Sequence, residues 1–206
     1  LENTLMSVER DQDRQQVANA VAEADQLLAT FNALLRIARL EVGRKVSNFQ
    51  NFNLSELVQD AAELYEALAE DKEQKLTVAI EEQVELTGDR DLLFQTLCNL
   101  IDNAIKYTPE GGEIDLSLTS ADNKIFLSVA DSGIGIPEDE RDKVFQRFYR
   151  VAKSRSLPGN GLGLSLVLAV MDLHHSKVIL GDNEPGLQVE LVFPKALPAS
   201  LIHKES

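Results

Sequence analysis

The sequence contains one cysteine and no tryptophan, and none of its 206 residues belong to an apolar run long enough to cross a bilayer. The single cysteine, Cys98, excludes an internal disulfide and any zinc site built from several thiolates. No signal peptide opens the sequence. We therefore expect a soluble protein or a soluble part of a larger one.

Basic residues are few, because 20 Lys and Arg stand against 34 Asp and Glu, which gives a formal charge of −14. Nucleic-acid phosphates are bound by a positive field, so this balance argues against nucleic acid as a main partner. Any anionic ligand must be held by cations that cluster locally. The segment 141–155 is such a cluster, with six basic residues and one acidic residue, Asp142.

The first 45 residues predict helices. From Arg14 to Glu41, apolar residues recur at near-heptad spacing, which is typical of a helix packed against other helices. We expect a helical hairpin over 1–45 that pairs with a second copy in a four-helix bundle. Packing against the chain's own globular part is the alternative. A second domain is expected over 46–194, and a tail without pattern over 195–206.

Helical and strand patterns follow one another in the second domain. Residues 46–53 predict a linker that can add a short edge strand. The predicted helices span 53–73, a segment that starts at Asp89, and 161–174; the predicted strands span 76–81, 84–86, 113–119, 124–130, 177–180 and 187–193. Two adjacent hairpins with three helices on one side make an α+β fold, a two-layer α/β sandwich with a mixed sheet.

The helix that starts at Asp89 carries amides beside its apolar stripe. Asn99, Asn103 and Lys106 (or Tyr107) recur at steps of three and four residues, so they share one helical edge. An amide oxygen can join a Mg²⁺ shell while an ammonium faces phosphate, so this edge suits an anionic ligand that is bound to a metal. A polar face met by solvent is the alternative.

Two glycine-rich loops follow. Asp131 ends a predicted strand directly before Gly133 and Gly135, where a carboxylate can accept a hydrogen bond from an exocyclic amine and a flat ring can approach the backbone. This arrangement is typical of adenine recognition, and a simple turn is the alternative. The second loop, 159–165, precedes an apolar helix, so its amides and the helix dipole favour an anion. It has no P-loop ending.

The basic segment 141–155 lies between these loops. Phe145, Phe148 and Tyr149 alternate with its cations, which predicts a mobile lid pinned by aromatic residues whose cations reach phosphate. The cations expected to reach phosphate are Arg147, Arg150, Lys153 and Arg155. A solvated basic loop is the alternative.

Four motifs in this order resemble the asparagine box, first glycine box, phenylalanine box and second glycine box of bacterial sensor histidine kinases. They read N-L-I-D-N-A-I-K-Y, D-S-G-I-G-I-P, F-Q-R-F-Y-R and G-N-G-L-G-L-S, and the resemblance covers about 52–194. It implies the Bergerat ATP-binding fold shared with gyrase, Hsp90 and mismatch-repair ATPases. It also implies that ATP and Mg²⁺ are the cofactors.

The resemblance assigns thirteen residues to the ATP site. On the helix, Asn103 would be the Mg²⁺ ligand with Asn99 near the metal and phosphates, Lys106 would pair with phosphate, and Tyr107 would flank the nucleotide. Asp131 would accept a hydrogen bond from the adenine amino group, in a pocket shaped by Gly133, Gly135 and Ile136. Arg150 would contact phosphate from the lid, and the triphosphate would be lined by Gly161, Leu162, Gly163 and Leu164.

One position distinguishes the relatives. Hydrolytic members of the fold carry a glutamate general base one turn before the metal-binding asparagine. Here that position is Asn99, which cannot take a proton at neutral pH. We expect ATP to be held for transfer rather than hydrolysed efficiently.

The phosphoacceptor motif H-E-L-R-T-P-L of the family is missing. The three histidines are His174, His175 and His203, and none has the required neighbours, so no catalytic residue is assigned. We expect that the sequence begins just after this motif, as a cytoplasmic part of a protein of the bacterial inner membrane, and that it binds ATP without autophosphorylation.

The resemblance implies a protein histidine kinase core in two-component signalling. It would transfer the γ-phosphoryl group to a histidine and thence to an aspartate in the receiver domain of a response regulator. The intact protein would be a homodimer through its N-terminal helices. The alternatives are a hydrolytic ATPase of the same fold and a nucleotide-dependent dimerisation or interaction module.

Overall fold

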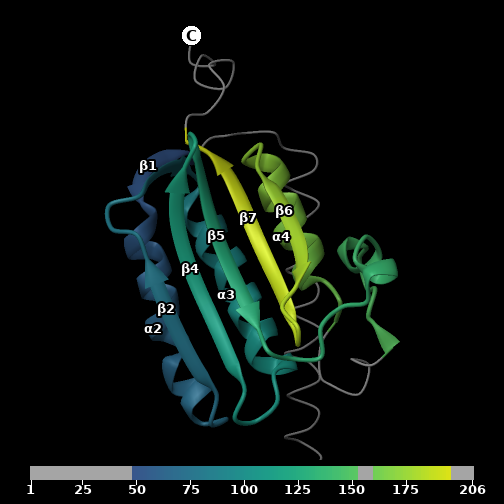
Figure 1. The fold of residues 1–206 in the computed structure, drawn as a ribbon. Coiled ribbons are helices and arrows are strands. Elements are labelled where there is room, and N and C mark those ends of the chain that lie inside the picture. The colour runs from purple at the N-terminus through teal and green to yellow at the C-terminus, as the bar shows by residue number, and fades with distance from the viewer. Residues whose placement is uncertain (1–47, 153–159, 196–206) are drawn as a thin grey trace, which may run out of the picture.

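The computed structural model of the chain describes residues 48–152 and 160–195. Within them, five strands form one mixed sheet in the order β2-β4-β5-β7-β6, and three helices cover one face of it (Figure 1). The strands are β2 (Lys75–Ile80), β4 (Glu113–Ala121), β5 (Lys124–Asp131), β6 (Lys177–Asp182) and β7 (Leu187–Pro194); the helices are α2 (Leu54–Glu70), α3 (Arg90–Tyr107) and α4 (Gly163–Leu173). The expected α+β two-layer sandwich is confirmed.

The sheet is built from two hairpins and one parallel edge strand. The turn of the β4–β5 hairpin holds Asp122 and Asn123 at φ of 49° and 62°, the left-handed pair that matches strand twist in a two-residue turn. The β6–β7 hairpin lies beside the β4–β5 hairpin, because β7 pairs with β5. Strand β2 pairs in parallel with β4, which makes the sheet mixed.

The segment expected to add an edge strand forms a separate small sheet instead. Strand β1 (Gln50–Asn53) pairs with β3 (Glu85–Gly88) in antiparallel register. Leu54 N donates to the Val84 carbonyl at 2.8 Å, so this two-stranded sheet is tied to the first turn of α2. The predicted strand at 84–86 is therefore real, but it does not belong to the main sheet.

Helix α2 ends at Glu70, three residues before its predicted end. The chain turns there because Glu73 adopts φ of 54° and Gln74 N donates to the Ala69 carbonyl. The side chain of Gln74 is buried, and its Nε2 donates to the carbonyls of Ile105 and Thr108 at 3.0 and 2.7 Å. This contact holds the C-terminal end of α3, whose last residues reach the functional site.

The core lies between the helices and the sheet. Leu97 and Ile101 of α3 are fully buried together with Ile114 and Leu118 of β4. Buried apolar area of this kind provides the main stabilisation of the fold. No helix in the described ranges is long and apolar enough to span a membrane. The predicted hairpin over 1–45 and the tail after residue 195 lie outside those ranges.

We expect Asn53→Ala to lower the free energy of unfolding by about 1 kcal/mol, because the Asn53 side chain caps α2 by accepting hydrogen bonds from Ser55 N and Glu56 N. Urea unfolding measures the effect. Asn51→Ala, on an exposed position of the same strand, is the control. Asn51→Ala removes only exposed side-chain contacts to Glu85 and Thr87. An Asn53→Ala variant as stable as the wild type would show that the cap contributes nothing.

Candidate functional site

A cavity of about 200 Å³ lies between the C-terminal half of α3, the end of β5 and the segment before α4. This volume exceeds that of a single water molecule several-fold, so it suits a larger ligand. Eleven of the thirteen predicted site residues line it: Asn99, Asn103, Lys106, Tyr107, Asp131, Gly135, Ile136, Arg150, Gly161, Gly163 and Leu164. The residues that the four motifs single out thus converge on one cavity.

Helix α3 presents its polar edge to this cavity because its apolar edge is fixed in the core. Asp89 caps the helix by accepting a hydrogen bond from Leu92 N at 3.1 Å. Leu97 and Ile101, on the opposite side of the helix, are fully buried in the core, which orients Asn99 and Asn103 toward the cavity. The helical period predicted from the sequence is therefore the one that places these amides.

Asp131 lies at the end of β5 and is only 6% exposed. Its Oδ1 accepts hydrogen bonds from Gly133 N at 2.8 Å and Leu187 N at 3.3 Å. Among the described residues no donor reaches Oδ2, which leaves that oxygen for a ligand. Burial raises the pKa of Asp131, although the two backbone amides act in the opposite direction.

Gly133 does not line the cavity, but it allows the first glycine loop to pass close to α3. A Cβ at Gly133 would lie 2.5 Å from the Tyr107 carbonyl oxygen, so no side chain fits there. Gly135 adopts φ of 63° and faces the backbone of Gly186. The loop can therefore follow the wall of the cavity only with glycine at these two positions.

The second glycine loop meets the amides of α3. A Cβ at Gly163 would lie 3.3 Å from Asn103 Nδ2 and 3.9 Å from Asn99 Oδ1, so the missing side chain leaves a cradle beside both amides. Gly163 is the first residue of α4, whose free N–H groups favour a negative charge. Leu162 does not line the cavity, because its side chain is 1% exposed in the core.

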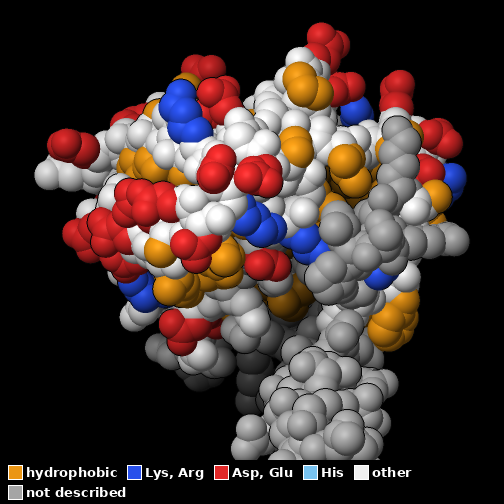
Figure 2. Space-filling view, turned by 90° about the horizontal axis from the view of Figure 1, so that it is seen from below, with side chains coloured by type: hydrophobic (Ala, Val, Ile, Leu, Met, Phe, Trp, Pro, Cys, Tyr) orange, Lys and Arg blue, Asp and Glu red, His pale blue; other side chains and the backbone are white. Residues whose placement is uncertain are grey.

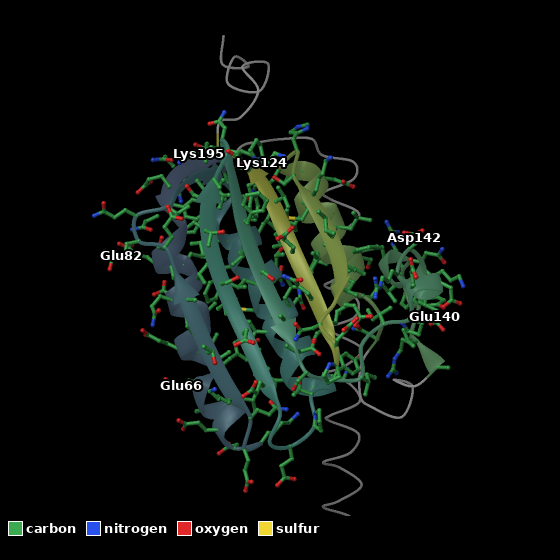
Figure 3. The ribbon with its side chains drawn as sticks, in the orientation of Figure 1. Glu66, Glu82, Lys124, Glu140, Asp142 and Lys195 are labelled. Carbon is green, nitrogen blue, oxygen red and sulfur yellow. The ribbon has the colours of Figure 1, made fainter. Side chains whose placement is uncertain are left out.

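The segment between the two loops extends to one side of the sheet, beyond β6, where Figure 3 labels Glu140 and Asp142. It contains two short 3-10 turns, at Glu138–Glu140 and Lys143–Phe145. Tyr149 OH donates to Glu140 at 3.1 Å, and Arg141 Nε donates to the Ile136 carbonyl at 3.3 Å. Residues 153–159, with two of the predicted phosphate-binding cations, lie outside the described ranges.

The charges of the described surface are unevenly distributed. Seen from the end of the sheet where β5 stops, acidic side chains are densest on the side of α2 and β2, and Lys and Arg side chains are among those near the middle of the view (Figure 2). Lys106 of α3 and Arg150 of the segment between the two glycine loops both line the cavity. These cations supply the local positive charge that an acidic chain needs to hold an anion.

Several lining residues were not predicted. Asp102 lies between the predicted amides on α3, and Leu187 and Val189 share one face of β7. The strict alternation of β7 could have identified the last two, since residues two apart in a strand point to the same side. Tyr149 and Asn160 also line the cavity and belong to the predicted lid and second loop.

His174, at the end of α4, is 2% exposed and has a structural role. Its Nδ1 lies 2.7 Å from the Val170 carbonyl, and its Nε2 accepts a hydrogen bond from Asp89 N at 3.0 Å. Phe49 stacks on the ring at a centroid distance of 4.6 Å. Burial lowers the pKa of His174 and keeps the ring neutral. The ring is unsuited to accept a phosphoryl group because it is enclosed and both of its nitrogens are engaged.

Comparison with known families gives one matching model, described as histidine kinase-, DNA gyrase B- and HSP90-like ATPase, over residues 88–197. Sensor-like histidine kinase SenX3 of Mycolicibacterium smegmatis is 31% identical over 81% of this chain and 44% of its own length. Adaptive-response sensory kinase SasA of Crocosphaera subtropica is 36% identical over 76% of this chain and 39% of its own length. The chain thus spans less than half of these curated relatives.

Solved structures agree with these matches. The catalytic domain of histidine kinase ThkA superposes with a TM-score of 0.65 at 31% identity, over 71% of this chain and 95% of that domain. Full-length ShkA in complex with AMPPNP gives 0.76 at 27% identity, over 88% of this chain and 38% of ShkA. ThkA in complex with the response regulator TrrA gives 0.68 at 26% identity, over 85% of this chain and 49% of ThkA.

The buried His174 predicts a loss of stability in mild acid. The pKa of His174 in the folded state lies below the ordinary value of about 6.5. The contribution of the neutral ring to the free energy of unfolding is therefore complete above about pH 6.5 and is lost as the pH falls toward the folded pKa. The free energy of unfolding should fall by up to about 1.4 kcal/mol per pH unit in this window. Urea unfolding at pH 7.5, 6.5 and 5.5 measures this slope.

The variants His174→Gln and His175→Gln separate this histidine from its exposed neighbour. The slope should become shallower only in His174→Gln, which cannot titrate. The same slope in wild type and His174→Gln would contradict the assignment.

Proposed function

Since this chain belongs to the sensor histidine kinases and carries their gyrase- and HSP90-like ATPase domain, we propose that residues 46–194 bind ATP with Mg²⁺ and hold the γ-phosphoryl group for transfer to a histidine. The observation that carries this proposal is that the two walls of the cavity present different polar groups. A carboxylate acceptor, Asp131, lies on one wall, and two amides beside a side-chain-free helix start lie on another.

The adenine end of the proposed site is Asp131. Its Oδ2 can accept a hydrogen bond from the 6-amino group of adenine, since both backbone donors are taken up by Oδ1. The apolar residues Ile134, Ile136 and Val189 line the same cavity and offer contacts to the faces of a flat ring. A 6-oxo purine would place an acceptor against this carboxylate and would bind more weakly.

The phosphate end is formed by α3 and the second glycine loop. The space that Gly163 leaves beside the side-chain amides of Asn99 and Asn103 suits a Mg²⁺–triphosphate, because amide oxygens are hard ligands and an added Cβ would come within 3.3 Å of the Asn103 amide. When bound, Mg²⁺ would neutralise charge on the β- and γ-phosphates. Lys106 and Arg150 would bind phosphate oxygens, and the α4 N-terminus would add its dipole.

We propose that the site positions ATP for phosphoryl transfer rather than hydrolysing it. Asn99 lies one turn before the proposed metal ligand Asn103, and an amide cannot remove a proton from water at neutral pH. The amide can hold the metal or the phosphates without activating water. We therefore propose that ATP remains intact until an acceptor histidine reaches its γ-phosphate, with catalysis from alignment and charge neutralisation.

The remaining partners are proposed from the relatives. ThkA has been solved with a response regulator, and we propose a receiver domain of that class as the final acceptor of the phosphoryl group. We also propose that residues 1–45 contribute a helical hairpin through which two copies associate. We propose that the acceptor histidine lies outside these 206 residues, because none of His174, His175 and His203 has the neighbours of the family's phosphoacceptor motif.

We expect Asp131→Asn to weaken ATP binding at least tenfold, because the new Nδ2 would present a donor to the adenine amino group. The same variant should bind inosine triphosphate better relative to ATP than the wild type does. Calorimetric titration with Mg²⁺ measures both constants. Asp115→Asn, an exposed position on the neighbouring strand β4, is the matched control. Equal ATP binding in Asp131→Asn and wild type would remove the adenine assignment.

The same variant should be more stable than the wild type at pH 7. Burial raises the folded pKa of Asp131, so the native state is penalised for ionising it, and this penalty grows from about pH 4 upward until the folded pKa is passed. An asparagine carries no charge and avoids the penalty. Urea unfolding of both proteins at pH 4 and pH 7 should show a difference only at the higher pH.

Phosphoryl transfer is tested by supplying the acceptor separately. Incubated with radiolabelled ATP and Mg²⁺, the chain should label an added sensor-kinase helical fragment that carries a histidine box, and should release little inorganic phosphate alone. Rapid phosphate release that Asn99→Ala abolishes would favour a hydrolytic ATPase. Tight ATP binding without transfer would favour a nucleotide-dependent interaction module.

A further inference from the structure

The turn between β6 and β7, residues 183–186, contacts Asp131 although none of the four motifs includes it. Asn183 Nδ2 donates a hydrogen bond to the Asp131 carbonyl at 2.9 Å. Leu187, the first residue of β7, pairs with Asp131 in the sheet and donates its N–H to Oδ1. The backbone and the carboxylate of Asp131 are therefore held from the same side of the chain.

Gly186 brings this turn into contact with Asp131. It adopts φ of 121°, and an added Cβ would lie 1.7 Å from the Asp131 carbonyl oxygen, which no side chain can occupy. The Gly186 carbonyl in turn lies 2.9 Å from the Cβ that Gly135 lacks. The turn is thus packed between the end of β5 and the first glycine loop.

A further pair ties the first glycine loop to the same turn. Arg141 Nη2 lies 3.5 Å from Asp182 Oδ2, while its Nε donates to the Ile136 carbonyl. Asp182 Oδ1 also accepts a hydrogen bond from Glu184 N at 3.2 Å, at the start of the turn. An exposed ion pair adds little stability, but these contacts restrict how the loop and the turn move relative to each other.

We propose that Asn183 is a positioning residue that sets base selectivity by fixing the backbone of Asp131, so that Oδ2 meets the 6-amino group of adenine. The inference rests on the proposed ATP-binding function and adds a determinant outside the predicted motifs. The carboxylate leaves the chain one bond from the anchored peptide, so a small shift of the Asp131 carbonyl displaces Oδ2. Hydrogen-bond selectivity between 6-amino and 6-oxo purines depends on such placement.

Other groups that face Asp131 do not supply this anchor. Asp102 and Lys106 of α3 and Arg150 of the lid share the cavity with it, and Asp182 and Glu184 flank Asn183. Of the described side chains, Asn183 is the one that donates to the Asp131 carbonyl. Asn183→Ala would remove that donor. Asn183→Asp would replace it by a carboxylate, which repels the carbonyl oxygen and disfavours the ionised form of Asp131.

The test compares ATP and inosine triphosphate on the whole chain with Mg²⁺ between pH 5 and pH 8.5. Asn183→Ala should weaken ATP binding about fivefold or more. It should lower the preference for ATP over inosine triphosphate, measured as the ratio of their dissociation constants, by a similar factor. Asn183→Asp should do the same and also move the pH midpoint of ATP binding upward. Asn51→Ala, which lies on the separate small sheet, should change neither quantity. Asn183→Ser, with a shorter donor, is the milder variant if Asn183→Ala does not fold.

The outcomes separate this inference from the function on which it rests. A wild type that binds both nucleotides equally, or neither, overturns the proposed adenine site itself. The adenine site stands if the wild type prefers ATP and Asp131→Asn loses that preference. In that case, Asn183 variants with unchanged selectivity and an unchanged pH midpoint of ATP binding overturn the positioning role of Asn183. Lower thermal stability alone in these variants would assign Asn183 to the fold rather than to selectivity.

Discussion

The burial of one carboxylate constrains how three segments of this fold approach one another. A nearly enclosed Asp131 is tolerated because backbone N–H groups from two different segments converge on its Oδ1. Those segments are the first glycine loop and the start of β7. Both must approach the end of β5 closely, which explains the glycines at 133 and 186, where any side chain would collide.

The site combines a fixed side with a side made of loops. The fixed side consists of α3 and the end of β5, both anchored by residues that are buried in the core. The loop side consists of the second glycine loop and the segment 144–151 that precedes it. Phe148 N donates to the Gly161 carbonyl at 3.0 Å, and Gly161 adopts φ of 69° beside the backbone of Tyr149. The segment around Phe148 and Tyr149 and the second glycine loop are therefore joined by direct backbone contacts.

The sequence predicted those parts of the molecule that local patterns determine. The period of α3 placed Asn99 and Asn103 on one edge, and alternation located both strands of the β4–β5 hairpin. Pairings between distant segments have no such local signal. The parallel pairing of β2 with β4 and the union of β1 with β3 were not predicted for this reason.

The contact of Asn183 with Asp131 was also not predicted, because a contact between distant segments has no local signal in the sequence. Asn183 lies 52 residues from Asp131 in sequence, and nothing in its neighbours indicates a contact with that residue. The shortened end of α2 was also missed, because a left-handed residue such as Glu73 has no sequence signature like that of glycine. The roles assigned to the individual site residues and the hairpin over 1–45 remain predictions.

The cavity wall draws on residues from position 99 to position 189, contributed by α3, β5, both glycine loops, the segment between these loops, the start of α4 and β7. No single supersecondary unit contains it, so it comes into being only when the most sequence-distant pairings of the domain have formed. A ligand that occupies it binds the native state and not its fragments. Nucleotide occupancy and global folding are thereby thermodynamically linked, and ligand at 100 times its dissociation constant would add about 2.7 kcal/mol to the cooperative unfolding of the whole domain.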